Sequence, residues 1–222
     1  MLNASTFKFL KDLKKYNNKA WFDQHRKEYE AAKQDHLALV QEVIDLHGKK
    51  DPSIKLLTAK ECVFRINRDV RFSKDKSPYK VNFGASINKG GKKAWNAAGY
   101  YFHIEPGKSF AGGGLYMPEA PVLKMVRQEI DYNLEAFEKI IKNKKFKSLY
   151  GDLDRSSEMS LTRVPKGYEP DNPAASQLKL KGFIAMVNIP DEVLKSKAAA
   201  KTIATAFDVL SPLIQFLNQA TT

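Results

Sequence analysis

The sequence has little of the chemistry on which several common enzyme classes depend. Its 222 residues include one cysteine and four histidines, too few for a zinc site built from paired cysteines. No Gly-x-Ser-x-Gly, His-Glu-x-x-His or Cys-x-x-Cys motif is present, and these motifs mark serine hydrolases, zinc proteases and thiol redox enzymes. We therefore predict no metal site, and the sequence indicates neither a cofactor nor a defined reaction.

Long apolar runs are also missing. No stretch approaches the roughly 20 residues that a membrane helix needs, and lysines interrupt the opening segment 1–15, which does not resemble a signal peptide. The lone Cys62 lacks an internal disulfide partner, as is usual in a reducing compartment, and its apolar neighbours predict burial rather than reactivity. These absences predict a cytoplasmic protein with no membrane partner.

Positive charge is plentiful, and it is unevenly distributed. The formal net charge is +12, and the segment 60–93 alone holds ten basic and three acidic residues. A localised positive field favours phosphorylated or carboxylated ligands, and it attracts nucleic acid without sequence preference. Solubility alone also explains a basic composition, so the charge by itself does not decide between a ligand site and a solvated surface.

The segment 64–80, with the sequence FRINRDVRFSKDKSPYK, is where a site is predicted. It begins as a short strand in which Phe64 and Ile66 share one face, so Arg65 should project from the other face into a pocket or groove. Arginine binds carboxylates and phosphates through two parallel hydrogen bonds. We predict an anion-binding site formed by arginine clamps, added lysine charge, orienting aspartates and a tyrosine: Arg65, Arg68, Asp69, Arg71, Asp75, Lys76, Tyr79 and Lys80.

Three other interpretations of this segment are open. In the first, its arginines and aspartates only pair with one another as a scaffold, in a structural or interaction protein. A nucleic-acid-binding protein is the second possibility, with Phe72, Tyr79 and Trp95 as stacking surfaces among the basic residues. An enzyme is the third: His103 with Glu105 or Asp69 would form an acid–base pair. If the protein is an enzyme, the basic and acidic groups of the segment 64–80 suit transfer or hydrolysis at a phosphorylated substrate.

Four sequence blocks carry a resemblance to a known family. The run R-x-x-R-D-x-R-F-x-x-D-K-x-P-Y-K at 65–80 resembles the signature of a widespread, uncharacterised bacterial family of unknown function. The aromatic and basic block at 17–29, the Gly-Gly-Gly-Leu-Tyr-Met-Pro block at 112–118 and the Pro-Lys-Gly-Tyr block at 165–168 are similar to other parts of that family. The resemblance extends over nearly the whole chain and implies no activity.

The pattern of apolar residues predicts an α+β fold, with a central antiparallel meander flanked by N- and C-terminal helices in a single domain, 1–222. Helical periodicity covers five segments: 6–16, 19–46, 122–132, 134–143 and 193–217. Strands are expected at 81–88, 99–105, 109–117 and 183–189. Within the third strand, three consecutive glycines at 112–114 indicate either close packing or the approach of a ligand.

Overall fold

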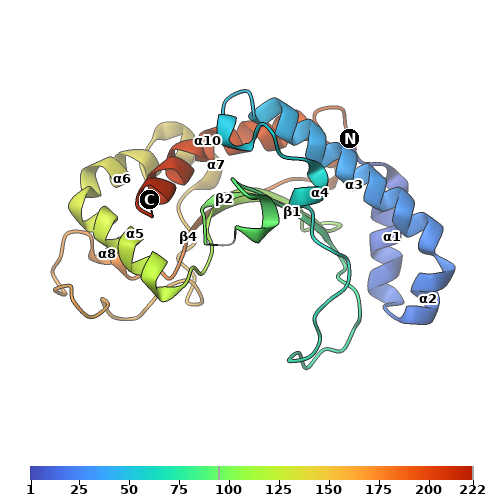
Figure 1. Cartoon of the computed structure of the whole chain (residues 1–222), viewed down its shortest axis with the longest axis horizontal. Helices are drawn as coiled ribbons and strands as arrows, with labels where there is room; N and C mark the ends of the chain where they lie inside the picture. Colours follow the sequence, from blue (N-terminus) through green and yellow to red (C-terminus); the bar gives the residue numbers. More distant parts are fainter. Residues whose placement is uncertain (95, 222) are drawn as a thin grey trace. The chain divides into compact units, whose positions relative to one another are not determined.

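The computed structural model describes residues 1–94 and 96–221 (Figure 1). In that part of the chain the sheet has four strands: β1 (Phe83–Ile87), β2 (Gly99–Ile104), β3 (Phe110–Leu115) and β4 (Phe183–Asn188). Their order is β1-β2-β3-β4, so strands that follow one another in sequence are neighbours in an antiparallel meander. The predicted α+β fold with a meander packed against N- and C-terminal helices is confirmed.

The helices follow the predicted segments with a few additions. Those of the described chain are α1 (Ala4–Lys15), α2 (Lys19–Gln24), α3 (Arg26–His47), α4 (Ala59–Cys62), α5 (Ala120–Tyr132), α6 (Leu134–Ile141), α7 (Lys144–Tyr150), α8 (Ala175–Leu178), α9 (Asp191–Leu194) and α10 (Ala199–Gln219). Short 3₁₀ turns occupy Pro52–Ile54 and Gly91–Lys93. No helix in the described part of the chain is long and apolar enough to cross a membrane.

The predicted helix 19–46 is broken at His25, between α2 and α3. Its ring lies 4.0 Å from the Trp21 ring and nearly parallel to it, and its Nδ1 is 2.8 Å from the Trp21 carbonyl oxygen. A side chain that binds a nearby carbonyl competes with the helical hydrogen-bond ladder. The prediction of one continuous helix was therefore wrong at this residue.

The chain divides into two compact units, each assembled from separate segments. Unit 1 comprises 1–92, 101–111 and 188–205, and unit 2 comprises 93–100, 112–187 and 206–222. Because both units gather segments from distant parts of the sequence, neither is delimited by a linker. A single domain over 1–222 stays a prediction.

The core of unit 1 lies between α1, α3 and β1. Helix α1 contributes Phe9, Leu10 and Leu13, all buried, and α3 contributes a fully buried apolar stripe from Leu39 to Ile44. One turn before that stripe, His36 is also buried, and its ring stacks on Phe83 of β1 at 5.2 Å between centroids. Burial of each large apolar side chain stabilises the fold by about 1.5–3 kcal/mol.

The core of unit 2 contains several aromatic rings among aliphatic side chains. Tyr100 of β2 packs on Phe207 of α10, with ring centroids 4.9 Å apart, and Phe137 of α6 meets Phe183 of β4 edge-on at 6.0 Å. The buried Tyr150 hydroxyl, at the end of α7, donates a hydrogen bond of 2.7 Å to the Ala206 carbonyl. A phenolic hydroxyl with a partner can be buried without the cost of an unsatisfied polar group.

The glycines of β3 are required by the strand beside them. A Cβ on Gly112 would overlap the Ala185 carbonyl oxygen, and a Cβ on Gly114 would overlap the Phe183 carbonyl oxygen. Gly114 also has φ +121°, a conformation that residues with a Cβ rarely adopt. The packing interpretation is confirmed, and the close neighbour is the backbone of β4.

A comparison of alanine substitutions at Gly114 and Gly107 separates the effect of steric overlap from that of backbone strain. We expect Gly114→Ala to lower the free energy of unfolding by on the order of 3 kcal/mol, since both overlap and positive φ act against it. Gly107, in the β2–β3 turn, has φ +75°, but no atom lies within 4 Å of the place that a methyl group would take. Gly107→Ala should therefore cost only about 1 kcal/mol. Urea unfolding curves measure the free energy of unfolding of both variants. Equal losses of stability would contradict a steric overlap at Gly114.

The buried His36 predicts sensitivity to acid. Burial lowers the His36 pKa from 6.5 to about 4, so between these values the unfolded chain binds a proton that the folded chain does not. Stability therefore falls as the pH drops through this window, by roughly 3 kcal/mol in total. We expect His36→Leu to remove this loss in unfolding curves recorded from pH 7 to 4. An unchanged pH dependence in the variant would show that another group is responsible.

Candidate functional site

The predicted site segment, 64–80, forms a two-limbed projection that we call the arm (Figure 1). Antiparallel bridges pair Val63 with Ala85 and Asn67 with Tyr79. Between these bridges the Lys80 N–H donates to the Ile66 carbonyl at 2.8 Å. The short strand expected here is therefore one limb of an irregular ladder, paired at isolated positions rather than continuously.

The root of the arm is fixed to helix α2 and to the turn before it. The Tyr79 ring is only 6% exposed and stacks on Phe22 of α2, with centroids 4.0 Å apart. The Asn17 side chain donates to the Tyr79 carbonyl at 2.9 Å and accepts from the Tyr79 N–H at 3.1 Å. Tyr79, expected to contact a ligand, lies here as a packing anchor.

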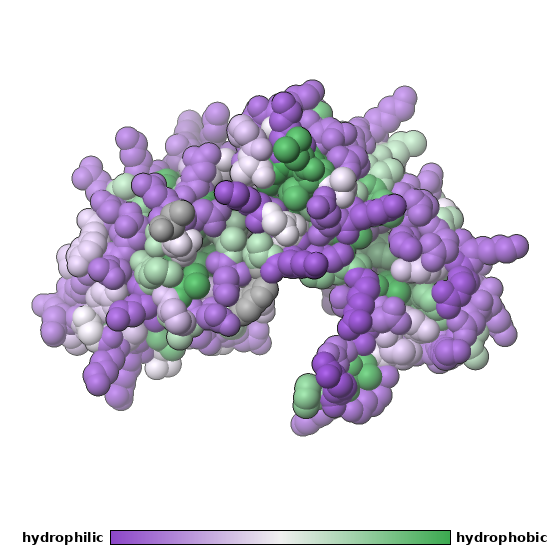
Figure 2. Space-filling model, viewed as in Figure 1, coloured by the Kyte–Doolittle hydropathy of each residue, from purple (hydrophilic) through white to green (hydrophobic). Residues whose placement is uncertain are grey.

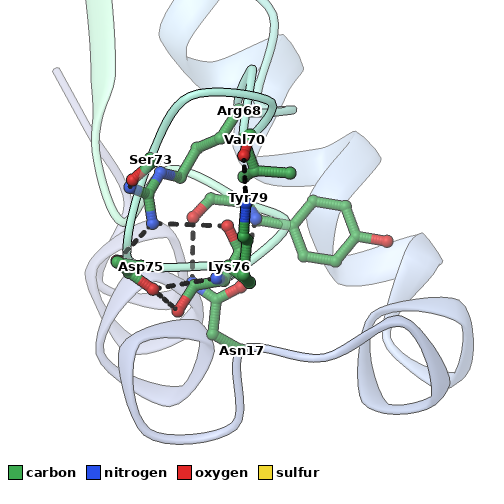
Figure 3. Close-up of polar contacts among 8 residues, drawn as sticks. Asn17, Arg68, Val70, Ser73, Asp75, Lys76 and Tyr79 are labelled. Atoms are coloured by element: carbon green, nitrogen blue, oxygen red, sulfur yellow. Dashed lines mark hydrogen bonds and ion pairs between the residues drawn. The ribbon is translucent and has the colours of Figure 1, made fainter.

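The tip of the arm is held by Asp75 (Figure 3). Its carboxylate accepts hydrogen bonds from the Ser77 N–H at 2.8 Å and the Ser77 hydroxyl at 2.6 Å, and it pairs with the Arg68 guanidinium. The Arg68 guanidinium also reaches the Ser73 hydroxyl at 3.4 Å. The Ser77 hydrogen bonds and the Arg68 pair lower the pKa of Asp75 to about 2.

The second arginine–aspartate pair lies at the same end of the arm. Arg71 binds Asp69 through two hydrogen bonds, Nε to Oδ1 at 2.9 Å and an Nη to Oδ2 at 2.6 Å. This bidentate contact lowers the Asp69 pKa and raises the Arg71 pKa. Lys76 donates to the Val70 carbonyl at 3.0 Å. Arg68, Arg71 and Lys76 thus all bind groups of the arm itself.

Two cations at the root are left without a bonded acid. Neither Arg65 nor Lys80 forms an ion pair or a hydrogen bond through its charged group with the residues that the structure describes. Lys80 is half-buried, with its ammonium 5.4 Å from the centre of the Phe64 ring. Burial and the charge of Arg65 together lower the Lys80 pKa. Arg65 itself is exposed, and its place in a pocket or groove stays a prediction.

Beside this root, three side chains of one face of β2 form a hydrogen-bonded row. The Tyr101 hydroxyl is 3.2 Å from His103 Nδ1, and His103 Nε2 is 3.4 Å from Glu105 Oε2. Lys14 of α1 donates to the other Glu105 oxygen at 3.1 Å. The alternation of β2 predicted the shared face, and of the two hypothetical partners of His103 the structure selects Glu105. Asp69 is engaged by Arg71 instead.

Aromatic rings and one glycine position this row. Phe110 of β3 stacks on the His103 ring at 4.9 Å with only 10° between the planes, and the Phe64 ring lies 6.4 Å from that of Tyr101. A Cβ on Gly84 would come within 2.6 Å of the Tyr101 hydroxyl, so glycine makes the space that this hydroxyl occupies. The contributions of Phe110 and Gly84 had no signal in the sequence, because strand pairing creates them.

The environment sets the charge of each member of the row. Burial raises the Tyr101 pKa to about 12. Burial also lowers the pKa of His103, against an opposing effect of Glu105. Burial acts to raise the Glu105 pKa, but hydrogen bonds from Lys14 and His103 outweigh it and the net shift is downward. Near neutral pH the row therefore holds a neutral phenol, a largely neutral imidazole and a carboxylate, an arrangement suited to proton transfer.

Other predicted features lie outside these two groups of residues. Cys62 is buried as expected, and burial raises its thiol pKa to about 11, which disfavours the reactive thiolate. Trp95, proposed as a stacking surface, lies outside the described residues. Among the described residues no cluster of three or more histidines, cysteines or acids is placed to hold a metal ion.

Comparison with known protein families identifies a family for nearly the whole chain. Residues 5–216 match the family described as conserved hypothetical protein, DUF2461. No curated protein and no solved structure shows significant similarity to the chain. The match covers the arm and the β2 row, and it bears out the family resemblance carried by the sequence blocks.

The arrangement of the tip predicts that Asp75 holds the arm in shape. Asp75→Ala should speed hydrogen exchange of the backbone amides in 69–77, since the variant loses the acceptor for Ser77 and the partner of Arg68 together. The melting temperature should change little because the tip is exposed. Asp75→Asn, which keeps an acceptor for the Ser77 N–H, should show a smaller effect. Equal protection in wild type and Asp75→Ala would contradict the bracing role.

Proposed function

The chain belongs to the DUF2461 family of conserved hypothetical proteins, and we propose that it binds a small anionic ligand at Arg65 and Lys80. The observation that supports this proposal is that no acid of the described chain is bonded to either cation. Elsewhere in the arm, each aspartate already pairs with an arginine. The positive charge at the root remains available to a ligand.

The energetics of Lys80 favour an external anion. Its ammonium is partly removed from water and lies near a second positive charge, and both effects act against the charged form. A phosphate or carboxylate bound between the two cations would offset the repulsion. Arg65 offers a planar fork for two anion oxygens, while Lys80 acts as a compact point charge.

The residues beside the root suit the organic part of such a ligand. Phe64 contacts both Lys80 and Tyr101 and is 38% exposed, which leaves part of an aromatic face for apolar contact. The Tyr101–His103–Glu105 row then supplies a hydroxyl and an imidazole held by a carboxylate. In an enzyme these groups would serve transfer or hydrolysis at a phosphorylated substrate, the reaction class that fits them best.

The proposal divides the predicted anion-binding residues into two roles. Arg65 and Lys80 carry the ligand. The pairs Arg68–Asp75 and Arg71–Asp69 brace the arm, with Lys76 bound to a backbone carbonyl and Tyr79 anchored on α2. Bracing fixes the limb that bears Lys80, and a fixed cation loses less conformational entropy when it binds an anion.

Thermal unfolding with and without inorganic phosphate tests the site. Phosphate should raise the wild-type melting temperature, because a ligand at 100 times its dissociation constant adds about 2.7 kcal/mol to stability. Lys80→Gln and Arg65→Gln should abolish most of this gain without lowering the stability of the ligand-free protein, because each removes one of two mutually repelling charges. A panel of phosphorylated and carboxylated metabolites, measured in the same way, would then rank the ligand class.

Lys89→Gln is the matched control, since Lys89 is an exposed lysine just after β1 and outside the arm, and its loss removes the same charge. The control should keep the phosphate response. The proposal fails if phosphate and the metabolite panel leave the wild-type melting temperature unchanged, or if Lys89→Gln reduces the response as much as Lys80→Gln does.

A further inference from the structure

The tip of the arm presents an aromatic ring to solvent. The Phe72 side chain is 94% exposed, which makes almost all of its surface available for contact. Within the described chain its ring lies near the Arg71 guanidinium, 5.7 Å from the ring centre. One isolated apolar residue on a surface is ordinary. The exposure of Phe72 therefore indicates a binding site only together with the charges around it.

Those charges are mostly positive. The arm contains six basic residues and two acids, and both acids are held by Arg68 and Arg71. Lys74 and Lys76 are exposed on either side of Asp75 and form no ion pair with a described residue. Figure 2 shows the arm as a mainly hydrophilic surface with a small hydrophobic patch toward its end. An aromatic face beside uncompensated cations is complementary to a base and its phosphates.

The tip is also held in position before any partner arrives. Asp75 accepts three hydrogen bonds from groups within the arm, two from Ser77 and one from Arg68, and Lys76 closes the turn on the Val70 carbonyl. A braced loop loses less entropy on binding than a mobile one. The arm is therefore a projecting platform rather than a loose tail.

We propose that the tip of the arm binds single-stranded nucleic acid, with one base stacked on Phe72 and adjacent phosphates at Lys74 and Lys76. A single strand is favoured over a duplex because the faces of its bases are free to stack on a side chain. Both aspartates of the arm are already bonded to arginines, so neither carboxylate is free to read base edges. Stacking on Phe72 and lysine contacts to phosphates do not depend on the identity of the base, so recognition there should be independent of sequence. This binding uses the tip, whereas the anion site uses the root.

Fluorescence anisotropy with a labelled oligothymidylate of about 20 nucleotides tests the proposal. Phe72→Ala should weaken binding about 5- to 100-fold, the loss expected from one base–aromatic stack, and Phe72→Trp should retain it. Lys74→Gln combined with Lys76→Gln should make the slope of log K against log salt less steep by about 1.4. The control pair Lys144→Gln and Lys145→Gln removes the same charge from an exposed part of α7 and should leave binding nearly unchanged.

Four results would overturn the proposal. They are no binding at low salt, binding that Phe72→Ala leaves intact, equal weakening by the arm pair and the α7 pair, and displacement of the oligonucleotide by poly-glutamate that is equally strong in wild type and Phe72→Ala. Poly-glutamate stands here for an acidic protein partner. Phe72→Ala should keep the stabilisation by phosphate, so failure at the tip and failure at the root give different results. Unchanged melting temperatures of the tip variants would show that they remain folded.

Discussion

The contact between the Asn17 side chain and the Tyr79 backbone is the constraint on which the arrangement of the candidate site residues depends. With the stack of Tyr79 on Phe22, it fixes one limb of the arm to helix α2. The Asn17 amide provides the hydrogen bonds that a neighbouring strand would otherwise make. The N–H and carbonyl of Tyr79 therefore both have partners, although they are partly removed from water. Lys80 follows directly, and its place beside Phe64 is a result of this attachment.

Charge compensation divides the arm into a tip and a root with different properties. Near the tip, arginine and aspartate neutralise one another over short distances in the sequence, and such exposed pairs contribute more to local order than to global stability. At the root, no acid among the described residues is bonded to Arg65 or Lys80, and partial burial of Lys80 makes this unbalanced positive charge costly. A rigid arm alone does not require this unbalanced charge, which is why the proposed ligand site lies at the root.

The fold was largely predictable from the sequence, whereas the partition of the site was not. Side-chain alternation identified the strands at 99–105 and 109–117 of the meander, because alternation is a local property of the sequence. The break at His25 was not predicted, because it accompanies a contact between the His25 ring and the Trp21 carbonyl that the pattern of apolar residues does not reveal. In the site, pairing Arg68 with Asp75 required the geometry of the turn, and the contact of Lys14 with Glu105 spans 91 residues. Neither is encoded by a local pattern.

Gly84 of β1 leaves room for a side chain of the neighbouring strand β2. The hydroxyl of Tyr101 fills the volume where a side chain of β1 would stand, so its hydrogen bond to His103 depends on the absence of a Cβ at position 84. One contact of the β2 row is thereby set by a residue with no polar side chain and no charge. A larger residue at position 84 would displace the Tyr101 hydroxyl while leaving every titratable group in place.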